Sequence, residues 1–145
     1  VEIDRETGRV AIRKYVVVDD CGTRLNPATV EGMTQGGVAQ GVAAALLEEY
    51  HYTSDGQPGS TTFLDYLLPT INEVPMTEKS ALVTPSPLSP LGAKGCGEGA
   101  LHTAPAAVMC AINDALAPTG AMAREVPASP DRLWQLLRET RLHHE

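Results

Sequence analysis

The order of apolar and polar residues changes along the chain from a strand-like to a helix-like pattern. Residues 1–4 and 10–19 are rich in β-branched side chains and flank a glycine-containing turn, which predicts a β-hairpin. Beyond a polar loop, small and apolar residues recur at helical spacing over residues 27–49. We expect a long helix there, because Asn26 is a suitable N-cap and Pro27 suits the first helical position.

The rest of the chain alternates irregularly between strand-like and helix-like stretches. Three further strands are expected, at residues 49–53, 61–67 and 79–84. Two further helices are expected: one follows a glycine-rich loop and has Pro105 in its first turn, and the other opens at Ser129. We therefore predict an α+β fold for residues 1–145, a single domain with a mixed sheet, hairpins and about three helices.

Composition narrows the class of protein. The 145 residues carry a formal charge of -7 without any basic cluster, which argues against a nucleic-acid partner. No apolar run approaches the ~20 residues of a membrane span, and no signal-peptide pattern is present. The three cysteines form no Cys-x-x-Cys pair, so we expect no structural zinc site and a cytoplasmic location. The chain begins without methionine, and we interpret it as a fragment of a longer protein.

The loop SPLGAKGCGEG, residues 89–99, places four glycines and a proline around one lysine and one glutamate. Glycine is costly in ordered structure, so such a segment is either a slack linker or a place where backbone approaches a ligand closely. The P-loop pattern fails, because Lys94 precedes Gly95 and no hydroxyl residue follows. A dinucleotide-binding fingerprint fits loosely as Gly95-x-Gly97-x-x-Ala100, although prolines interrupt the preceding strand.

Glu98 stands at the end of this loop, immediately before the expected second helix. A carboxylate there could simply stabilise the helix dipole, by about 0.3–1 kcal/mol. That role does not require bare backbone on both sides, yet Glu98 lies between Gly97 and Gly99. We therefore also consider Glu98 a catalytic or anchoring carboxylate within an anion-binding concavity formed by the N–H groups of the loop.

Four stretches of the sequence together resemble one known family. In chain order they are VVVDDCGTRLNP, VEGMTQGGVAQG, PSPLSPLGAKGCGEGALHTAPAAVMCAINDAL and PASPDRLWQLL. They cover most of residues 10–137 and resemble the C-terminal part of the large, molybdopterin-binding subunit of xanthine oxidase-family molybdenum hydroxylases. The resemblance is greatest to large subunits of the aerobic carbon monoxide dehydrogenase type. It implies that the loop glycines let the backbone and Glu98 approach a molybdenum centre.

The resemblance also implies roles for particular residues. Glu98 takes the position of the general base, which accepts a proton as an oxygen attacks an electron-poor substrate carbon. The loop containing Thr23 and Arg24, with the N-terminal half of the first helix, lines the pterin side. Met33 stands where the family usually has a glutamine, and Gln35 is the candidate replacement. No protein ligand to the metal is expected, and the remaining cofactor-binding candidates are Lys94, Gly95 and Gly97.

The implied cofactor is molybdenum-molybdopterin in its cytosine dinucleotide form, with [2Fe-2S] and FAD groups on partner subunits. The implied substrate is an aldehyde, an N-heterocycle or a carbon monoxide-type molecule. We expect the whole enzyme to be an oligomer, and this chain to be inactive without the remainder of the large subunit. From the residues alone two other functions stay open: a nucleotide-binding domain that uses the glycine-rich loop for pyrophosphate, or a non-catalytic assembly module. Lys94 likewise has two candidate partners, an anionic part of the cofactor or Glu98.

Overall fold

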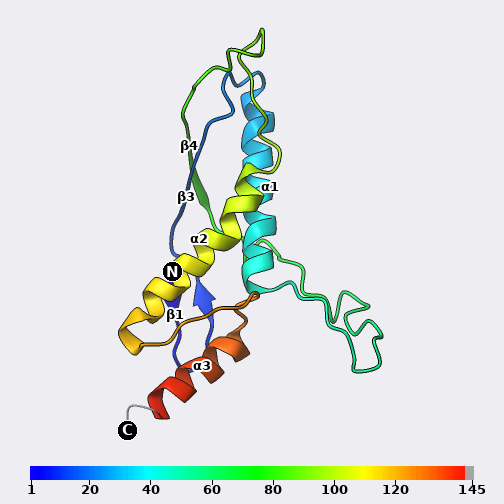
Figure 1. Cartoon of the computed structure of the whole chain (residues 1–145), viewed down its shortest axis with the longest axis vertical. Helices are drawn as coiled ribbons and strands as arrows, with labels where there is room; N and C mark the ends of the chain where they lie inside the picture. The colour runs from blue at the N-terminus through cyan, green and yellow to red at the C-terminus, as the bar shows by residue number, and fades with distance from the viewer. Residues whose placement is uncertain (143–145) are drawn as a thin grey trace.

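The computed structural model describes residues 1–142, which combine helices with short strands (Figure 1). In chain order the elements are β1 (Glu2–Ile3), β2 (Val10–Ala11), β3 (Tyr15–Asp19), α1 (Pro27–Leu46), β4 (Thr77–Ala81), α2 (Gly99–Leu116), a 3-10 turn η1 (Ala117–Thr119) and α3 (Pro130–Leu142). The predicted α+β class is confirmed. Its strands form two separate two-stranded sheets, one antiparallel and one parallel. No helix within the described residues is long and apolar enough to cross a membrane.

The N-terminal hairpin is confirmed, but the second predicted strand divides in two. β1 pairs antiparallel with β2, so that Glu2 lies opposite Ala11. β3 then leaves the hairpin and pairs parallel with β4, with Val17 opposite Lys79. The prediction of one strand over residues 10–19 is wrong because β3 takes its partner from a distant segment, which a local pattern does not reveal. β4 spans residues 77–81 rather than 79–84.

α1 begins where the sequence predicts and ends at Leu46 rather than at residue 49. The Asn26 side chain accepts a hydrogen bond from the Thr29 N–H at 3.1 Å, which caps the helix. Gly37 and Gly41 lie against α2: added Cβ atoms would come within 2.9 Å and 2.5 Å of the Cβ atoms of Ala100 and Ala104. These two glycines therefore allow α1 and α2 to pack at backbone distance.

Pro105 lies inside α2 rather than in its first turn, which corrects the prediction. A proline in a helix interior removes one hydrogen bond and costs about 3 kcal/mol. Pro105 faces α1, because a Cβ added at Gly41 would lie 3.0 Å from its Cδ and 3.1 Å from the Leu101 carbonyl oxygen. The Leu101 carbonyl, which lacks its usual N–H donor because residue 105 is proline, therefore lies in the α1–α2 contact. Packing of α1 against α2 offsets the lost hydrogen bond.

The core lies where the three helices meet the N-terminal strands. Its largest fully buried side chains are Val38 and Val42 of α1, Ile112 and Leu116 of α2, and Leu133 of α3. α3 begins at Pro130 as predicted. The loop before α1 and the loop between β4 and α2 meet at the opposite end of the molecule from α3, at the top of Figure 1. The core therefore packs the three helices together, and the two loops lie at the end of the molecule away from α3.

Residues 50–76 form an arm that projects from the C-terminal end of α1 (Figure 1). The strands predicted at residues 49–53 and 61–67 are absent from it; a single isolated bridge joins Tyr52 and Pro58. An isolated hairpin gains little without a sheet or core to cover it. Here the apolar side chains that suggested strands face outward, since Phe63 and Leu64 are 84% and 91% exposed.

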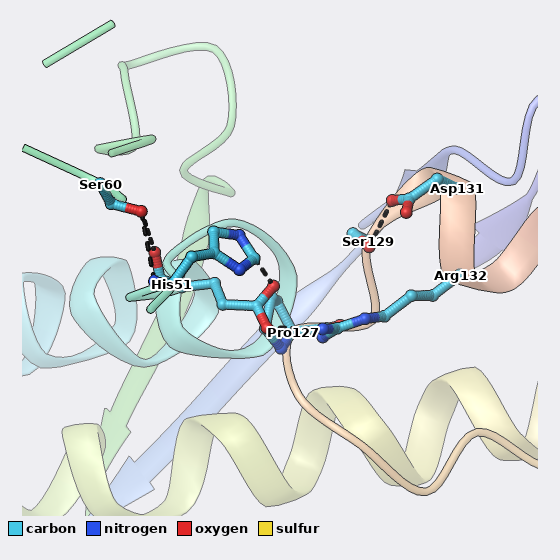
Figure 2. Close-up of polar contacts among 7 residues, drawn as sticks. His51, Ser60, Pro127, Ser129, Asp131 and Arg132 are labelled. Carbon is cyan, nitrogen blue, oxygen red and sulfur yellow. Dashed lines mark hydrogen bonds and ion pairs between the residues drawn. The ribbon is translucent and has the colours of Figure 1, made fainter. Parts of the chain in front are cut away.

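The base of the arm is tied to α3 (Figure 2). Arg132 donates from Nη2 to Glu49 Oε1 at 2.5 Å and from Nη1 to the Pro127 carbonyl at 3.0 Å. Within the arm, the His51 N–H donates to Ser60 Oγ at 3.3 Å, as Figure 2 shows. These contacts set the direction in which the arm leaves α1.

Candidate functional site

Two loops that are distant in sequence pair at the N-terminal end of α1. The Thr23 N–H donates to the Gly92 carbonyl at 3.1 Å, and the Lys94 N–H donates to the Cys21 carbonyl at 2.8 Å. Between them Gly22 has a φ of 66°, and a Cβ there would overlap the Gly92 carbonyl oxygen. Only glycine fits this crossing. The predicted site loops are therefore joined by their backbones.

Asp20 ties three segments of this loop pair together. Its Oδ1 accepts the Gly22 N–H at 2.9 Å and the Thr84 N–H at 3.1 Å, and it lies 3.0 Å from Lys94 Nζ. Hydrogen bonding from Thr84, then the Gly22 N–H and Lys94, holds the pKa of the Asp20 carboxyl well below its usual range. Lys94 therefore pairs with Asp20 and not with Glu98. Sequence reasoning missed Asp20 as a site residue; its only signal was its place in the stretch VVVDDCGTRLNP.

Arg24 lies half-buried beside the first turns of α1. Its Nη2 contacts Glu31 Oε1 at 3.3 Å, whereas its buried Nε has no hydrogen-bond partner among the described residues. A small cavity of about 30 Å³ adjoins Arg24 and Glu31. The Nε–H group of Arg24 is thus a hydrogen-bond donor without an acceptor in the described part of the chain.

Thr23 is also half-buried, and its Oγ1 lies close to Gly92. A Cβ added at Gly92 would lie 2.8 Å from Thr23 Oγ1.

The glycine-rich loop has the open space that a bulky ligand requires. No chain atom within residues 1–142 lies within 4 Å of a Cβ placed on Gly95, and for Gly97 the nearest is Met33 Cε at 3.7 Å. The end of the Met33 side chain therefore lies beside Gly97, and Gln35 lies half-buried two residues further along α1. The loop is not a dinucleotide-binding turn, because β4 ends at Ala81 and α2 begins only at Gly99.

Glu98 occupies the N-cap position of α2, but its carboxylate makes no capping hydrogen bond to the helix. Its Oε2 instead lies 3.3 Å from Nε2 of His102, one turn along α2, and its side chain is 76% exposed. The Glu98 carboxylate therefore does not cap the helix by hydrogen bonding, although its charge at the N-terminus still favours the helix dipole. The sequence reading missed His102, although its i, i+4 spacing from Glu98 on a predicted helix was the available signal.

The residues present fit a large anionic cofactor. The open faces of Gly95 and Gly97 would admit it to the backbone, and the partly exposed guanidinium of Arg24 adds a positive charge for an anionic group. Thr23 and Lys94 belong to the two loops that pair through their backbones. Within residues 1–142, no three His, Cys, Asp or Glu side chains are grouped as a metal site.

Comparison with known proteins decides the family. Residues 1–75 match the model of the molybdopterin cofactor-binding domain. The chain belongs to this family. The nicotine 6-hydroxylase large subunit of Paenarthrobacter nicotinovorans is 44% identical over 92% of this chain and 16% of its own length. The carbon monoxide dehydrogenase large chain of Hydrogenophaga pseudoflava is 40% identical over 98% of this chain and 18% of its own.

The fold agrees with these sequence matches. The crystal structure of quinoline 2-oxidoreductase from Pseudomonas putida 86 superposes with a TM-score of 0.92 at 45% identity, over 94% of this chain and 17% of that one. The resemblance to large subunits of molybdenum hydroxylases is therefore confirmed. This molybdopterin cofactor-binding chain spans about a sixth of the length of the two relatives named above, 16% and 18%.

Proposed function

We propose that this chain is the C-terminal part of a molybdenum hydroxylase large subunit, where it supplies the catalytic base and part of the cofactor wall. The observation that carries the proposal is the position of Glu98. Its exposed carboxylate follows a loop whose open face would admit a large ligand, and membership of the molybdopterin cofactor-binding family supports molybdopterin as that ligand. When bound, the cofactor supplies the redox centre for oxidation of a substrate carbon.

In this proposal Glu98 accepts the proton released as the substrate is hydroxylated. A positioned carboxylate of this kind contributes about 10²–10⁴-fold to a rate. Because no capping bond holds the Glu98 side chain, its oxygens stay available to a substrate-side group. His102 Nε2 lies 3.3 Å from one of these oxygens, on the next turn of α2.

The same proposal assigns the cofactor wall. Gly95 and Gly97 bring bare backbone to the cofactor, and the partly exposed guanidinium of Arg24 donates to an anionic part of it. Thr23 and Lys94 act from the paired loops, with the Lys94 ammonium also held by Asp20. Gln35 takes the place of the amide that Met33 lacks. These remaining assignments rest on the family resemblance.

The whole enzyme follows from the same family membership. We propose a cytosine dinucleotide form of the cofactor, electron transfer to [2Fe-2S] and FAD subunits, and an oligomeric enzyme in the cytoplasm, where free thiols such as Cys21 stay reduced. The substrate is an aldehyde, an N-heterocycle or a carbon monoxide-type molecule. The relatives named above include a hydroxylase of nicotine and a carbon monoxide dehydrogenase, which supports that range.

Replacement of Glu98 by Gln in the native enzyme tests the proposal. The variant keeps size and hydrogen bonding but removes proton acceptance, so turnover should fall at least about 100-fold while molybdenum and pterin contents stay at the wild-type level. Glu139→Gln on the exposed side of α3 is the matched control and should retain full turnover. Wild-type turnover in Glu98→Gln would instead favour a non-catalytic assembly module.

A further inference from the structure

The parallel sheet formed by β3 and β4 is incomplete by itself. Within the described residues it has only these two strands. Parallel sheets normally have both faces covered, because their crossover connections place helices on those faces, and a parallel pair is slightly less stable than an antiparallel one. Val16 and Val18 of β3 are nonetheless 53% and 57% exposed. An apolar strand in this condition is a template for another strand.

The hydrogen-bond pattern shows which edge of β3 is open. The Leu82 N–H donates to the Asp19 carbonyl at 2.8 Å, so the main-chain groups of Asp19 point toward β4. Those of Val17 point the same way, because main-chain groups alternate along a strand. The N–H and C=O groups of Val16 and Val18 therefore point to the opposite edge, where no strand within residues 1–142 pairs with them.

A groove follows this open edge. Its volume is about 440 Å³, and five consecutive residues, 14–18, form one wall. These residues alternate between the two faces of β3, so the groove runs along the strand edge and not over one face. The other wall is α2, through Thr103, Ala107 and Ala111, which follow one another at helical spacing. These small side chains leave room for those of an added strand.

The sheet face beyond β3 is less suited to an apolar partner. Val16 lies opposite Glu78 of β4, and Val18 lies opposite Ser80. Glu78 is also paired with Lys14 at 3.0 Å across this face. The apolar surface is therefore confined to the strip along β3 and the groove beside it. This shape fits one extended chain segment better than a helix or a broad surface.

We propose that the open edge of β3 accepts an extended apolar strand from the remainder of the molybdopterin-binding subunit. The strand would bond to the main-chain groups of Val16 and Val18 and pack its side chains on α2. This proposal rests on the proposed function in one respect, namely that the chain belongs to a larger subunit. The relatives named above are long enough to contain such a strand outside the matched part, because this chain matches only 16% and 18% of their lengths.

Amide hydrogen exchange in the native enzyme that contains this chain tests the proposal directly. Val17 is the internal reference, because its N–H bonds to β4 whether or not another strand is present. If a strand is added, the amides of Val16 and Val18 should exchange within about tenfold of the Val17 rate. Exchange more than about tenfold faster than that of Val17 would show an open edge and overturn the proposal.

A photocrosslinking residue at position 16 identifies the occupant. In the native enzyme we expect an adduct with a segment of the large subunit outside residues 1–145. An adduct with a second copy of this chain, or the lack of any adduct, would overturn the assignment. Glu98→Gln and the molybdenum content are independent of these measurements. An open edge in an enzyme that holds molybdenum and depends on Glu98 would therefore refute the added strand and leave the proposed function intact.

Two substitutions separate strand pairing from folding. Val16→Pro removes the N–H that points away from β4 and leaves the N–H groups that pair with β4, and proline is tolerated at such edge positions. Val16→Thr keeps that N–H and the β-branched shape. Recovery of the assembled subunit should fall at least about tenfold in Val16→Pro relative to Val16→Thr. Equal recovery of the two variants would contradict the proposal, and the exchange measurement on the unmodified enzyme does not depend on either variant.

Discussion

Lys94 Nζ lies 3.0 Å from Asp20 Oδ1, and this ion pair joins the glycine-rich loop to the loop before α1. The same carboxylate oxygen also accepts the N–H groups of Gly22 and Thr84. One side chain therefore fixes the ends of three segments beside the proposed cofactor site. A charged acceptor makes stronger hydrogen bonds than a neutral one, so the charge of Asp20 stabilises this arrangement.

The first prediction concerns the pH dependence of stability. The folded-state pKa of Asp20 is lowered, so its contribution to the free energy of unfolding is present above the unfolded value of about 3.9 and is lost as pH falls toward the folded value. Asp20→Asn should be less stable than the wild type at pH 7. Because it lacks this titration, it should lose less stability than the wild type between about pH 5 and pH 2.

Urea unfolding at several pH values measures both effects. Asp114→Asn is the matched control, because Asp114 is exposed on α2 and makes no side-chain contact like that of Asp20. Parallel pH curves for Asp20→Asn and the wild type would contradict the role assigned to the ion pair.

The second prediction uses two glycines of the same helix. A Cβ added at Gly41 would lie 2.5 Å from Ala104 Cβ, whereas one added at Gly36 meets no atom within 4 Å. Gly41→Ala should lower the free energy of unfolding by about 1–3 kcal/mol through overpacking. Gly36→Ala should raise it by up to about 1 kcal/mol through helix propensity. Denaturant unfolding of both variants measures these changes. If both substitutions changed the free energy of unfolding in the same direction, the close α1–α2 contact would be refuted.

The third prediction concerns cofactor loading. Gly95→Val adds a side chain where the chain itself leaves open space, so folding should be unaffected. In the native enzyme that side chain would meet the bound cofactor, and molybdenum content should fall at least about tenfold. Elemental analysis measures the loss, with Gly59→Val in the arm as the control that should load normally. Full molybdenum occupancy in Gly95→Val would indicate that the loop is a slack linker that does not approach the cofactor.

The fourth prediction concerns the base of the arm. Arg132 and Glu49 form an ion pair whose side chains are about a third exposed. A double-mutant cycle with Arg132→Met and Glu49→Gln should give a coupling energy of about 0.5–1 kcal/mol. The more exposed pair of Arg13 and Glu2 should give a smaller value and serves as the comparison. A coupling near zero for the Arg132 pair would mean that the arm is not held by this contact.

Local sequence signals determined the features of this protein that depend on neighbouring residues. The cap at Asn26, the long helix after it and the start of α3 all follow from side chains within a few positions of each other. The glycine-rich loop and Glu98 were likewise visible, because an unusual local composition needs no tertiary partner to be recognised. Four such stretches, in their order along the chain, were by themselves enough to indicate the molybdopterin-binding family.

Tertiary structure alone decided the contacts that join distant segments. Local alternation predicts that residues 10–19 are extended, but it cannot show that β3 leaves its hairpin to pair with β4. The two strands predicted in the arm do not form, because strand formation depends on packing against neighbouring residues. Among the described residues none covers Phe63 or Leu64. Pro105 continues a helix because α1 packs against it. The choice of Asp20 as the partner of Lys94 arises in the same way, since only the folded loops bring their charges together.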